Sequence, residues 1–182
     1  DFDGLVIAGP PGDFWPGDVR RTLDSLIADG KWEDIGRRVK AIQQAMNDLR
    51  CAPIPAVIAA SGKTVGLGCA MALLAGRTQA LAESAMGFDE AVGGLIPMGG
   101  GIIELLRKAV ADLPPGGDLY PAVKQVFETL PAGRLSNNAA EARQMGLLQP
   151  HDGMTMNPDR LIADAKALAT SRAGQPPGHA DD

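Results

Sequence analysis

Apolar and polar positions along the chain predict strands and helices in alternation. Short apolar runs closed by Gly, Pro or Ser predict buried strands at 3–8 and 56–60, and a weaker alternation predicts another at 78–88. Apolar residues spaced three and four apart predict helices, most clearly over 31–49, where a stripe from Trp32 to Leu49 indicates a core-facing side. The fold class is therefore predicted as α/β.

Further helices complete the predicted chain. The segment 69–75 is apolar all round, which is typical of a buried helix. Pro and Gly at 114–117 separate a strand-containing half from a half in which only helices are predicted. We expect a core over 1–112, a helical part of the same domain over 113–173, and a disordered tail over 174–182. The other predicted helices are 18–29, 101–112, 119–130, 137–145 and 158–172.

Length and charge narrow the classes of protein. The 182 residues suffice for one domain with a sizeable core. A net charge of -5 and an aromatic share of 4% argue against nucleic-acid binding. No apolar run approaches the ~20 residues of a membrane span and no secretory signal is visible, so a cytoplasmic location is expected. The chain starts at Asp1 and enters an apolar run at once, so we expect a fragment truncated at the N-terminus.

Cysteine and histidine are too sparse for several common sites. Cys51 and Cys69 are not spaced as a metal or redox pair, and His151 and His179 lie near the C-terminus. No metal site and no His-based triad is therefore predicted. Ser-Gly-Lys-Thr at 61–64 lacks the earlier glycine of a phosphate-binding P-loop, and the glycines at 66 and 68 lack the third glycine of a dinucleotide site.

A polar turn over 61–68 leads into the buried helix and gives a first candidate site. The first turn of a helix leaves backbone N–H groups unpaired, and these donors suit an oxygen that gains negative charge during a reaction. The alternative is a tight turn that binds no ligand. Asp89 and Glu90 follow the next strand, where apolar surroundings would raise the pKa of a carboxyl and make it an acid or base. Their alternative role is that of solvated surface charges.

Four segments, taken together, resemble a known family. Residues 14–18, 55–71, 86–101 and 134–147 resemble, in this order, characteristic segments of the enoyl-CoA hydratase/isomerase (crotonase) family. These are the Phe-Ser-x-Gly-Ala-Asp, Ala-Leu-Gly-Gly-Gly-Cys-Glu-Leu, Phe-Gly-x-x-Glu…Pro-x-x-Gly-Gly and Arg-hydrophobic-Ser-Ala-x-Glu-Ala segments. The resemblance covers about residues 3–170 and implies a ββα spiral core with C-terminal helices.

Three shorter segments point to one branch of that family. Residues 30–33, 98–101 and 154–166 resemble the hydratase half of fused bacterial 3-hydroxyacyl-CoA dehydrogenase/enoyl-CoA hydratase proteins. The resemblance implies an acyl-CoA substrate of fatty-acid β-oxidation and no further cofactor. It also implies a dehydrogenase domain in the parent chain and a trimer-based homo-oligomer.

The resemblance assigns roles to individual residues. The N–H groups of Asp18 and Leu67 would form the oxyanion hole, and Leu67 would need a side-chain pocket that the family does not provide. The substrate pocket would include Gly66, Gly68, Ala70 and Pro97.

The two glutamates of the family's hydratases fall at Ala70 and Glu90, so only Glu90 is left as an acid or base. The predicted function is a hydratase/isomerase-type domain with weakened hydration. The alternatives are a non-catalytic acyl-CoA-binding or scaffolding domain, and an unrelated α/β domain.

Overall fold

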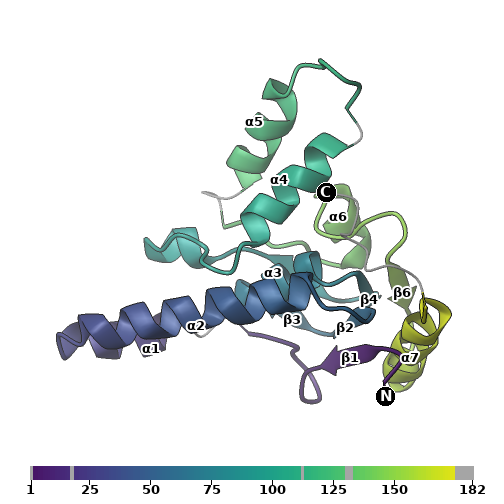
Figure 1. Cartoon of the computed structure of the whole chain (residues 1–182), viewed down its shortest axis with the longest axis horizontal. Helices are drawn as coiled ribbons and strands as arrows, with labels where there is room; N and C mark the ends of the chain where they lie inside the picture. The colour runs from purple at the N-terminus through teal and green to yellow at the C-terminus, as the bar shows by residue number, and fades with distance from the viewer. Residues whose placement is uncertain (1, 17–18, 112, 130–132, 175–182) are drawn as a thin grey trace.

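A four-stranded parallel sheet lies at the centre of the fold (Figure 1). The computed structural model describes residues 2–16, 19–111, 113–129 and 133–174. The strands lie in the order β1-β2-β4-β6, with Ile7 beside Ile58 and Ala80 beside Met154. Their bounds are β1 Leu5–Ala8, β2 Ala56–Ala60, β4 Arg77–Leu81 and β6 Gly153–Thr155.

Both faces of the central strand β2 are apolar, as expected of a parallel strand covered on both sides. Successive side chains of β2 point to opposite faces, so Val57 and Ala59 pack with α7 (Leu161–Ser171). Ile58 and Ala60 join the larger cluster that contains α3 (Leu67–Leu74). The apolar run of β2 is thus explained by burial on both sides.

A second, two-stranded parallel sheet pairs β3 (Lys63–Val65) with β5 (Ala85–Gly87). The strand predicted over 78–88 is therefore two strands in different sheets. Between them Ser84 turns the chain: its N–H donates to the carbonyl of Leu81 at 2.9 Å, and its hydroxyl donates to the carbonyl of Ala60 at 3.2 Å. This turn brings the end of β5 beside the end of β3.

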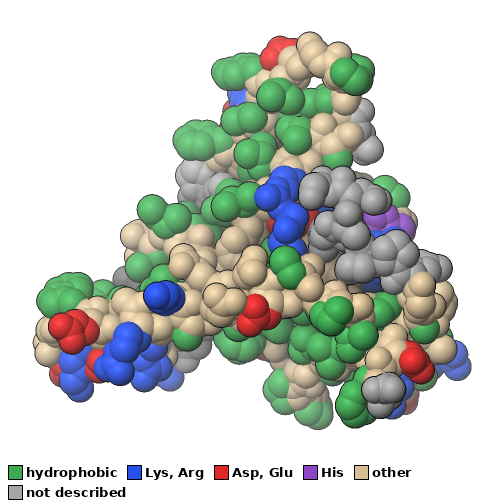
Figure 2. All heavy atoms as spheres, in the orientation of Figure 1, with side chains coloured by type: hydrophobic (Ala, Val, Ile, Leu, Met, Phe, Trp, Pro, Cys, Tyr) green, Lys and Arg blue, Asp and Glu red, His purple; other side chains and the backbone are tan. Residues whose placement is uncertain are grey.

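The remaining helices surround these sheets. In Figure 1, α2 passes in front of α3, whereas α4 and α5 project away from the strands. Hydrophobic side chains gather over this projecting part in Figure 2, and Tyr120 and Phe127 of α5 are exposed. The bounds are α1 Val19–Ala28, α2 Trp32–Arg50, η1 Glu90–Gly93, α4 Gly101–Ala111, α5 Tyr120–Thr129, α6 Ala139–Gln144 and η2 Pro158–Arg160.

Three further expectations about the elements are wrong or only partly right. The segment 61–68, expected as a turn, contains the strand β3. No residue of α2 is buried and Trp32 is 65% exposed, but the rest of the predicted stripe is half-buried and its last residue, Leu49, packs against the core. The second half is not all helical either, because β6 pairs with β4 as a sheet edge. The domain boundary at residue 113 stays a prediction, and residues 175–182 of the predicted tail lie outside the described residues.

Candidate active site at the start of helix α3

The turn from β3 into α3 depends on glycine. Gly66 caps the helix with φ 58° and ψ -117°, in the half of conformational space that side chains disfavour. Its N–H donates to the carbonyl of Gly87 at 2.9 Å, which ties the turn to the end of β5. Leu67 is the first residue of the helix, so its N–H has no helical acceptor. The turn therefore presents a backbone donor at the positive end of the helix dipole.

The segment that contains Phe14 and Trp15 forms a wall beside this turn. The N–H of Trp15 donates to the carbonyl of Lys63, and the N–H of Val65 donates to the carbonyl of Trp15, each at 2.9 Å. Gly68 allows the close approach, since a Cβ there would lie 2.4 Å from the Cβ of Trp15. Asp18, the other predicted oxyanion donor, lies outside the described residues and its role stays a prediction.

Glu90 lies directly beside the turn. It is only 9% exposed, and a Cβ added to Gly66 would lie 2.9 Å from its Oε1. Its Oε2 is buried and has no hydrogen-bond partner among the described residues. Burial raises the pKa of Glu90, and the nearby charge of Asp89 raises it further. The arrangement is that of a desolvated acid with one oxygen available, not of a solvated surface charge.

Ala70, one turn into α3, has very different neighbours. It is 1% exposed and lies against the start of α4. A Cβ added to Gly101 would be 2.8 Å from both the Cα and the Cβ of Ala70, and a Cβ added to Gly99 would be 3.1 Å from the latter. The space beside position 70 is thus filled by closely approaching backbone.

The pocket that Leu67 needs is present. The side chain is buried, and its Cδ2 would lie 2.9 Å from a Cβ at Gly99. The absence of a side chain at Gly99 therefore makes room for Leu67. The Leu67 side chain, which is unusual in this turn, can therefore be buried while the N–H of Leu67 remains a donor.

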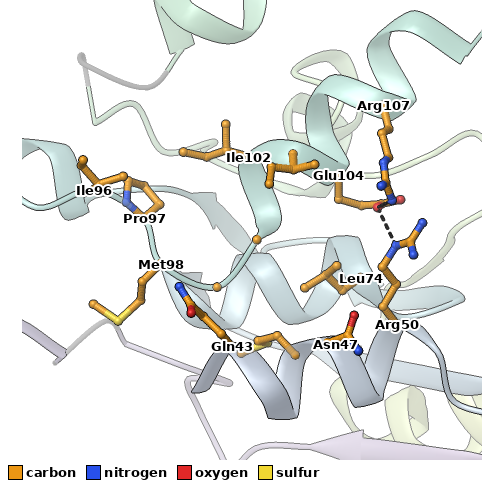
Figure 3. Close-up of a pocket in the computed structure, with 14 residues that line it drawn as sticks. Gln43, Asn47, Arg50, Leu74, Ile96, Pro97, Met98, Ile102, Glu104 and Arg107 are labelled. Atoms are coloured by element: carbon orange, nitrogen blue, oxygen red, sulfur yellow. Dashed lines mark hydrogen bonds and ion pairs between the residues drawn. The ribbon is translucent and has the colours of Figure 1, made fainter. Parts of the chain in front are cut away.

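Two cavities are lined in part by α3, and one of them borders this turn through Leu67. The α4 cavity has a volume of about 690 Å³ and lies between α2, α3 and α4 (Figure 3). The β1 cavity, of about 810 Å³, is bordered by β1, the segment 9–16, α1, α2 and α3. Met98 and α2 line both, which explains why the apolar stripe of α2 is only half-buried: Val39 and Ile42 line the β1 cavity, and Met46 lines the α4 cavity.

The predicted site residues are distributed unevenly around these cavities. Leu67 lines the β1 cavity, and Pro97 lines the α4 cavity. Gly66 and Gly68 instead shape the turn, and Ala70 lies behind it. Met98, which lines both cavities, and Gly99 and Gly101 are evident from the sequence only as parts of motifs, without a role in the site.

In the described part of the chain, no group of three or more His, Cys, Asp and Glu side chains is arranged to hold a metal ion. Within the same residues, no helix has both the length and the apolarity needed to cross a membrane.

Comparison with known proteins places the fold. No protein-family model matches the sequence. An enoyl-CoA hydratase from Polaromonas sp. JS666 superposes with a TM-score of 0.74 at 21% identity, over 93% of this chain and 59% of that one. An enoyl-CoA hydratase/isomerase from Mycobacterium paratuberculosis gives a TM-score of 0.73 at 21% identity, over 92% of this chain and 59% of that one. The chain has the crotonase fold. The α/β class and the family resemblance predicted from its motifs are thereby confirmed.

A sequence relative supports the predicted branch. The chain is 34% identical over 171 residues to the probable 3-hydroxyacyl-CoA dehydrogenase of Bacillus subtilis (strain 168). The alignment covers 94% of this crotonase-fold chain and 21% of the relative, so the chain spans about a fifth of that protein's length. The similarity agrees with the hydratase half of a fused protein.

Proposed function

We propose that this crotonase-fold chain binds an acyl-CoA thioester and moves one proton between two carbons of the acyl chain. The observation that carries the proposal is the buried, unpartnered Oε2 of Glu90 beside the turn into α3. The corresponding reaction converts a β,γ-unsaturated acyl-CoA into its α,β-unsaturated isomer. It needs one base, which then serves as the acid.

The proton transfer balances without water. The thioester oxygen accepts a hydrogen bond from the N–H of Leu67, which stabilises the negative charge that develops on this oxygen. Glu90 takes the proton from the α-carbon, and the electron pair of the broken C–H bond delocalises through the thioester and the double bond. Glu90 then returns the proton to the γ-carbon, the double bond lies between the α- and β-carbons, and the carboxylate is restored. A raised pKa suits this role because the carbon acid is weak.

Hydration by the same site should be slow. Adding water across a double bond requires a second positioned group, and Ala70 stands where hydratases of the family have one. The loss of one proton-transfer group reduces the rate by about 10²–10⁴. The start of α4 fills the space beside Ala70, and the other carboxylate near the turn, that of Asp89, lies on the Glu90 side, with its Oδ1 3.5 Å from a Cβ added to Gly66.

The two cavities suit the two halves of the substrate. The loop that follows Glu90 continues into Ile96, Pro97 and Met98, which line the α4 cavity. Glu90 is not among the described residues that line either cavity, but its loop leads to the α4 cavity, so we assign the acyl chain to the α4 cavity and the pantetheine of coenzyme A to the β1 cavity, which Leu67 lines. Pro97 then contacts the acyl chain, while Gly66, Gly68 and Ala70 shape the pocket from behind.

The wider setting belongs to the same proposal. The Bacillus subtilis relative is a probable 3-hydroxyacyl-CoA dehydrogenase, which fits a dehydrogenase part elsewhere in the parent chain and a role in fatty-acid β-oxidation. A trimer-based homo-oligomer, a cytoplasmic location and the absence of a further cofactor remain predictions from the family resemblance.

Parallel assays of the full-length protein test the proposal. Calorimetry measures the binding of a saturated acyl-CoA. Steady-state assays measure isomerisation with a β,γ-unsaturated acyl-CoA as substrate and hydration with crotonyl-CoA as substrate. We expect binding and isomerisation, with hydration slower than isomerisation. Hydration at a rate equal to or above isomerisation would contradict the assignment of Glu90 as the sole acid/base.

A non-catalytic acyl-CoA-binding or scaffolding role is the second candidate. The observation that favours it is the replacement of the family's glutamate by Ala70 in a closed environment. Binding of acyl-CoA with neither reaction detectable would establish this alternative.

A further inference from the structure

Basic side chains gather at the C-terminal end of α3, away from the turn that begins this helix. The Nζ of Lys108 in α4 donates to the carbonyl of Leu73 at 2.6 Å. The Nη1 of Arg77, the first residue of β4, donates to the carbonyl of Gly76 at 2.6 Å. Both cations thus lie at the negative end of the helix dipole, which they stabilise.

Two further arginines lie beside this helix end. Asp152, the residue before β6, accepts a hydrogen bond at Oδ1 from the N–H of Thr78 at 2.9 Å, and its backbone carbonyl accepts one from the Nη2 of Arg143 at 2.7 Å. Burial lowers the pKa of Arg77, and the nearby charge of Arg172, just after α7, lowers it further. We call the four cations the basic cluster: Arg77, Lys108, Arg143 and Arg172.

The charge of the basic cluster is not balanced by the described part of the chain. There, none of its four cations forms an ion pair with a carboxylate. Both carboxylate oxygens of Asp152 accept hydrogen bonds from backbone N–H groups. The other carboxylate near the cluster is Glu104, which also contacts Arg50 and Arg107. Even if both carboxylates are counted against the four cations, two positive charges remain.

The basic cluster also has N–H donors that bind no acceptor among the described residues. The Nε of Arg143 is buried and has no hydrogen-bond partner there. The Arg172 guanidinium, which carries five N–H donors, makes no hydrogen bond or ion pair with the same residues. A buried donor without an acceptor and unpaired like charges both destabilise a fold. Together they indicate an acceptor that is not part of the described chain.

Solvent can reach the basic cluster, and the cluster is separate from the candidate active site. Its four cations are half-buried, and His151, which precedes Asp152, is exposed. None of the four is among the described residues that line the α4 cavity or the β1 cavity. Leu73 follows Leu67 by six residues along α3, which corresponds to about 9 Å at 1.5 Å per residue.

We propose that the basic cluster binds an anion of the phosphate class, a phosphomonoester or diphosphate group, at a site separate from the candidate active site. Phosphate oxygens accept hydrogen bonds from several guanidinium groups at once, and such a group carries the multiple negative charges that the cluster lacks. A single carboxylate would leave one positive charge uncompensated. This inference does not depend on the proposed function.

The alternative is that the cations only fasten α4, β4 and α6 around the end of α3. The hydrogen bonds of Lys108 and Arg77 to backbone carbonyls fit this purely structural role. They do not account for Arg172, whose charge lies near that of Arg77 without a partner in the described chain. Arg172 is therefore the residue that separates the two explanations.

The first experiment measures anion binding to the full-length protein by calorimetry at constant ionic strength. Pyrophosphate should bind at millimolar concentrations or below, and more tightly than inorganic phosphate, because it presents more charge and more acceptor oxygens. Saturating octanoyl-CoA should not displace it, since coenzyme A also carries phosphate groups but is assigned to the cavities. Displacement by octanoyl-CoA would assign the bound phosphate group to coenzyme A and overturn the separate site.

Substitutions test whether the basic cluster is the site. Arg172→Gln should weaken pyrophosphate binding by about tenfold, and Arg172→Lys should restore part of the affinity. Lys166→Gln removes an exposed cation from α7 outside the cluster, so this matched control should bind as the wild type does. In urea unfolding, pyrophosphate should stabilise the wild type and Lys166→Gln more than Arg172→Gln.

The same unfolding curves without pyrophosphate distinguish binding from a structural role. Removing the charge of Arg172 relieves its repulsion with Arg77, so Arg172→Gln should be at least as stable as the wild type. A less stable Arg172→Gln whose affinity for pyrophosphate equals that of the wild type would establish the structural role. Absence of pyrophosphate binding to the folded wild type, or equal binding by Arg172→Gln, would overturn the proposal.

Discussion

The motif resemblance assigns the two glutamates of the family's hydratases to positions 70 and 90, and these two positions have opposite surroundings in this structure. At Glu90 a buried carboxyl has one oxygen without a hydrogen-bond partner among the residues that the structure describes. At Ala70, on the other side of the same turn, the backbone of Gly99 and Gly101 approaches to contact distance. The missing carboxylate has therefore not left an empty hole.

This difference indicates which chemistry the site retains. A buried acid without a full set of partners destabilises a fold, so its position beside backbone donors is better explained by proton transfer than by structure. Close packing of small residues around Ala70 stabilises the fold and excludes water from this position. A site of this kind suits transfer of a proton between carbons more than addition of water.

The largest expected effect concerns Glu90 itself. Glu90→Gln keeps the shape of the side chain but removes the base, so isomerisation should fall by about 10²–10⁴ while the affinity for a saturated acyl-CoA stays unchanged. Steady-state assays and calorimetry measure the two quantities. Glu83→Gln, at an exposed glutamate of the turn before β5, is the control and should leave both unaltered. Full activity of Glu90→Gln would show that another group moves the proton.

Placing a carboxylate at position 70 should not increase the rate of hydration. Ala70→Glu must fit a longer, charged side chain against Gly99, Gly101 and Phe88, so overpacking and carboxylate burial together should lower the free energy of unfolding by about 2–5 kcal/mol. We expect no gain in hydration. Ala140→Glu, at an exposed position of α6, should leave the stability nearly unchanged and serves as the control. A stable Ala70→Glu variant with faster hydration would mean that α4 can move away.

The closeness of α4 can be probed with single methyl groups. Gly101→Ala should lower the free energy of unfolding by about 1–3 kcal/mol, because the new Cβ meets the backbone of Ala70 and the ring of Phe88 at 2.8 Å. Gly99→Ala should lower the free energy of unfolding by less, because the closest neighbour of the new Cβ is the end of the Leu67 side chain, at 2.9 Å.

The control for both substitutions is Gly36→Ala on α2. A Cβ there meets nothing within 4 Å, so the substitution should stabilise the helix by about 0.5–1 kcal/mol. Urea unfolding measures all three variants. Equal effects of Gly99→Ala and Gly101→Ala would contradict the packing described around Ala70.

The sequence predicted the elements better than their surroundings. Periodicity placed most helices within a few residues, and β2 was evident from its apolar run. The strand β6 was missed because Gly153, Met154 and Thr155 show no alternation, and its place depends on a distant partner, the Gln79 side chain that donates to the hydroxyl of Thr155 at 2.8 Å. A three-residue strand fixed by such a contact leaves little local signal.

The candidate site shows the same limit. Motif order was enough to single out Glu90, Leu67 and Ala70, whose spacing matches the family. Burial of the Glu90 carboxyl and the closure of α4 over Ala70 arise from tertiary packing, which residue identity does not reveal. The α2 stripe has the spacing of a core helix, and only the structure shows that it lines cavities instead.

The smallest expected effect is a pH-dependent difference in stability at Glu90. Burial raises the pKa of this carboxyl above its ordinary value of 4.5, so over an interval above 4.5 the folded state holds a proton that the unfolded state has lost. The stabilising contribution of the protonated group is complete below pH 4.5 and is lost as the pH rises through the folded pKa. Above that value the wild type carries a buried carboxylate, which the neutral side chain of Glu90→Gln avoids.

Urea unfolding at a series of pH values, from below 4.5 to neutral, tests this difference. Relative to the wild type, Glu90→Gln should gain stability as the pH rises and then level off above the folded pKa. Glu83→Gln should show no such trend, because Glu83 is exposed to solvent. A flat difference for Glu90→Gln would place that carboxylate in contact with water. The contrast with the closed position at Ala70 would then lose its physical basis, even if Glu90 proved essential for the reaction.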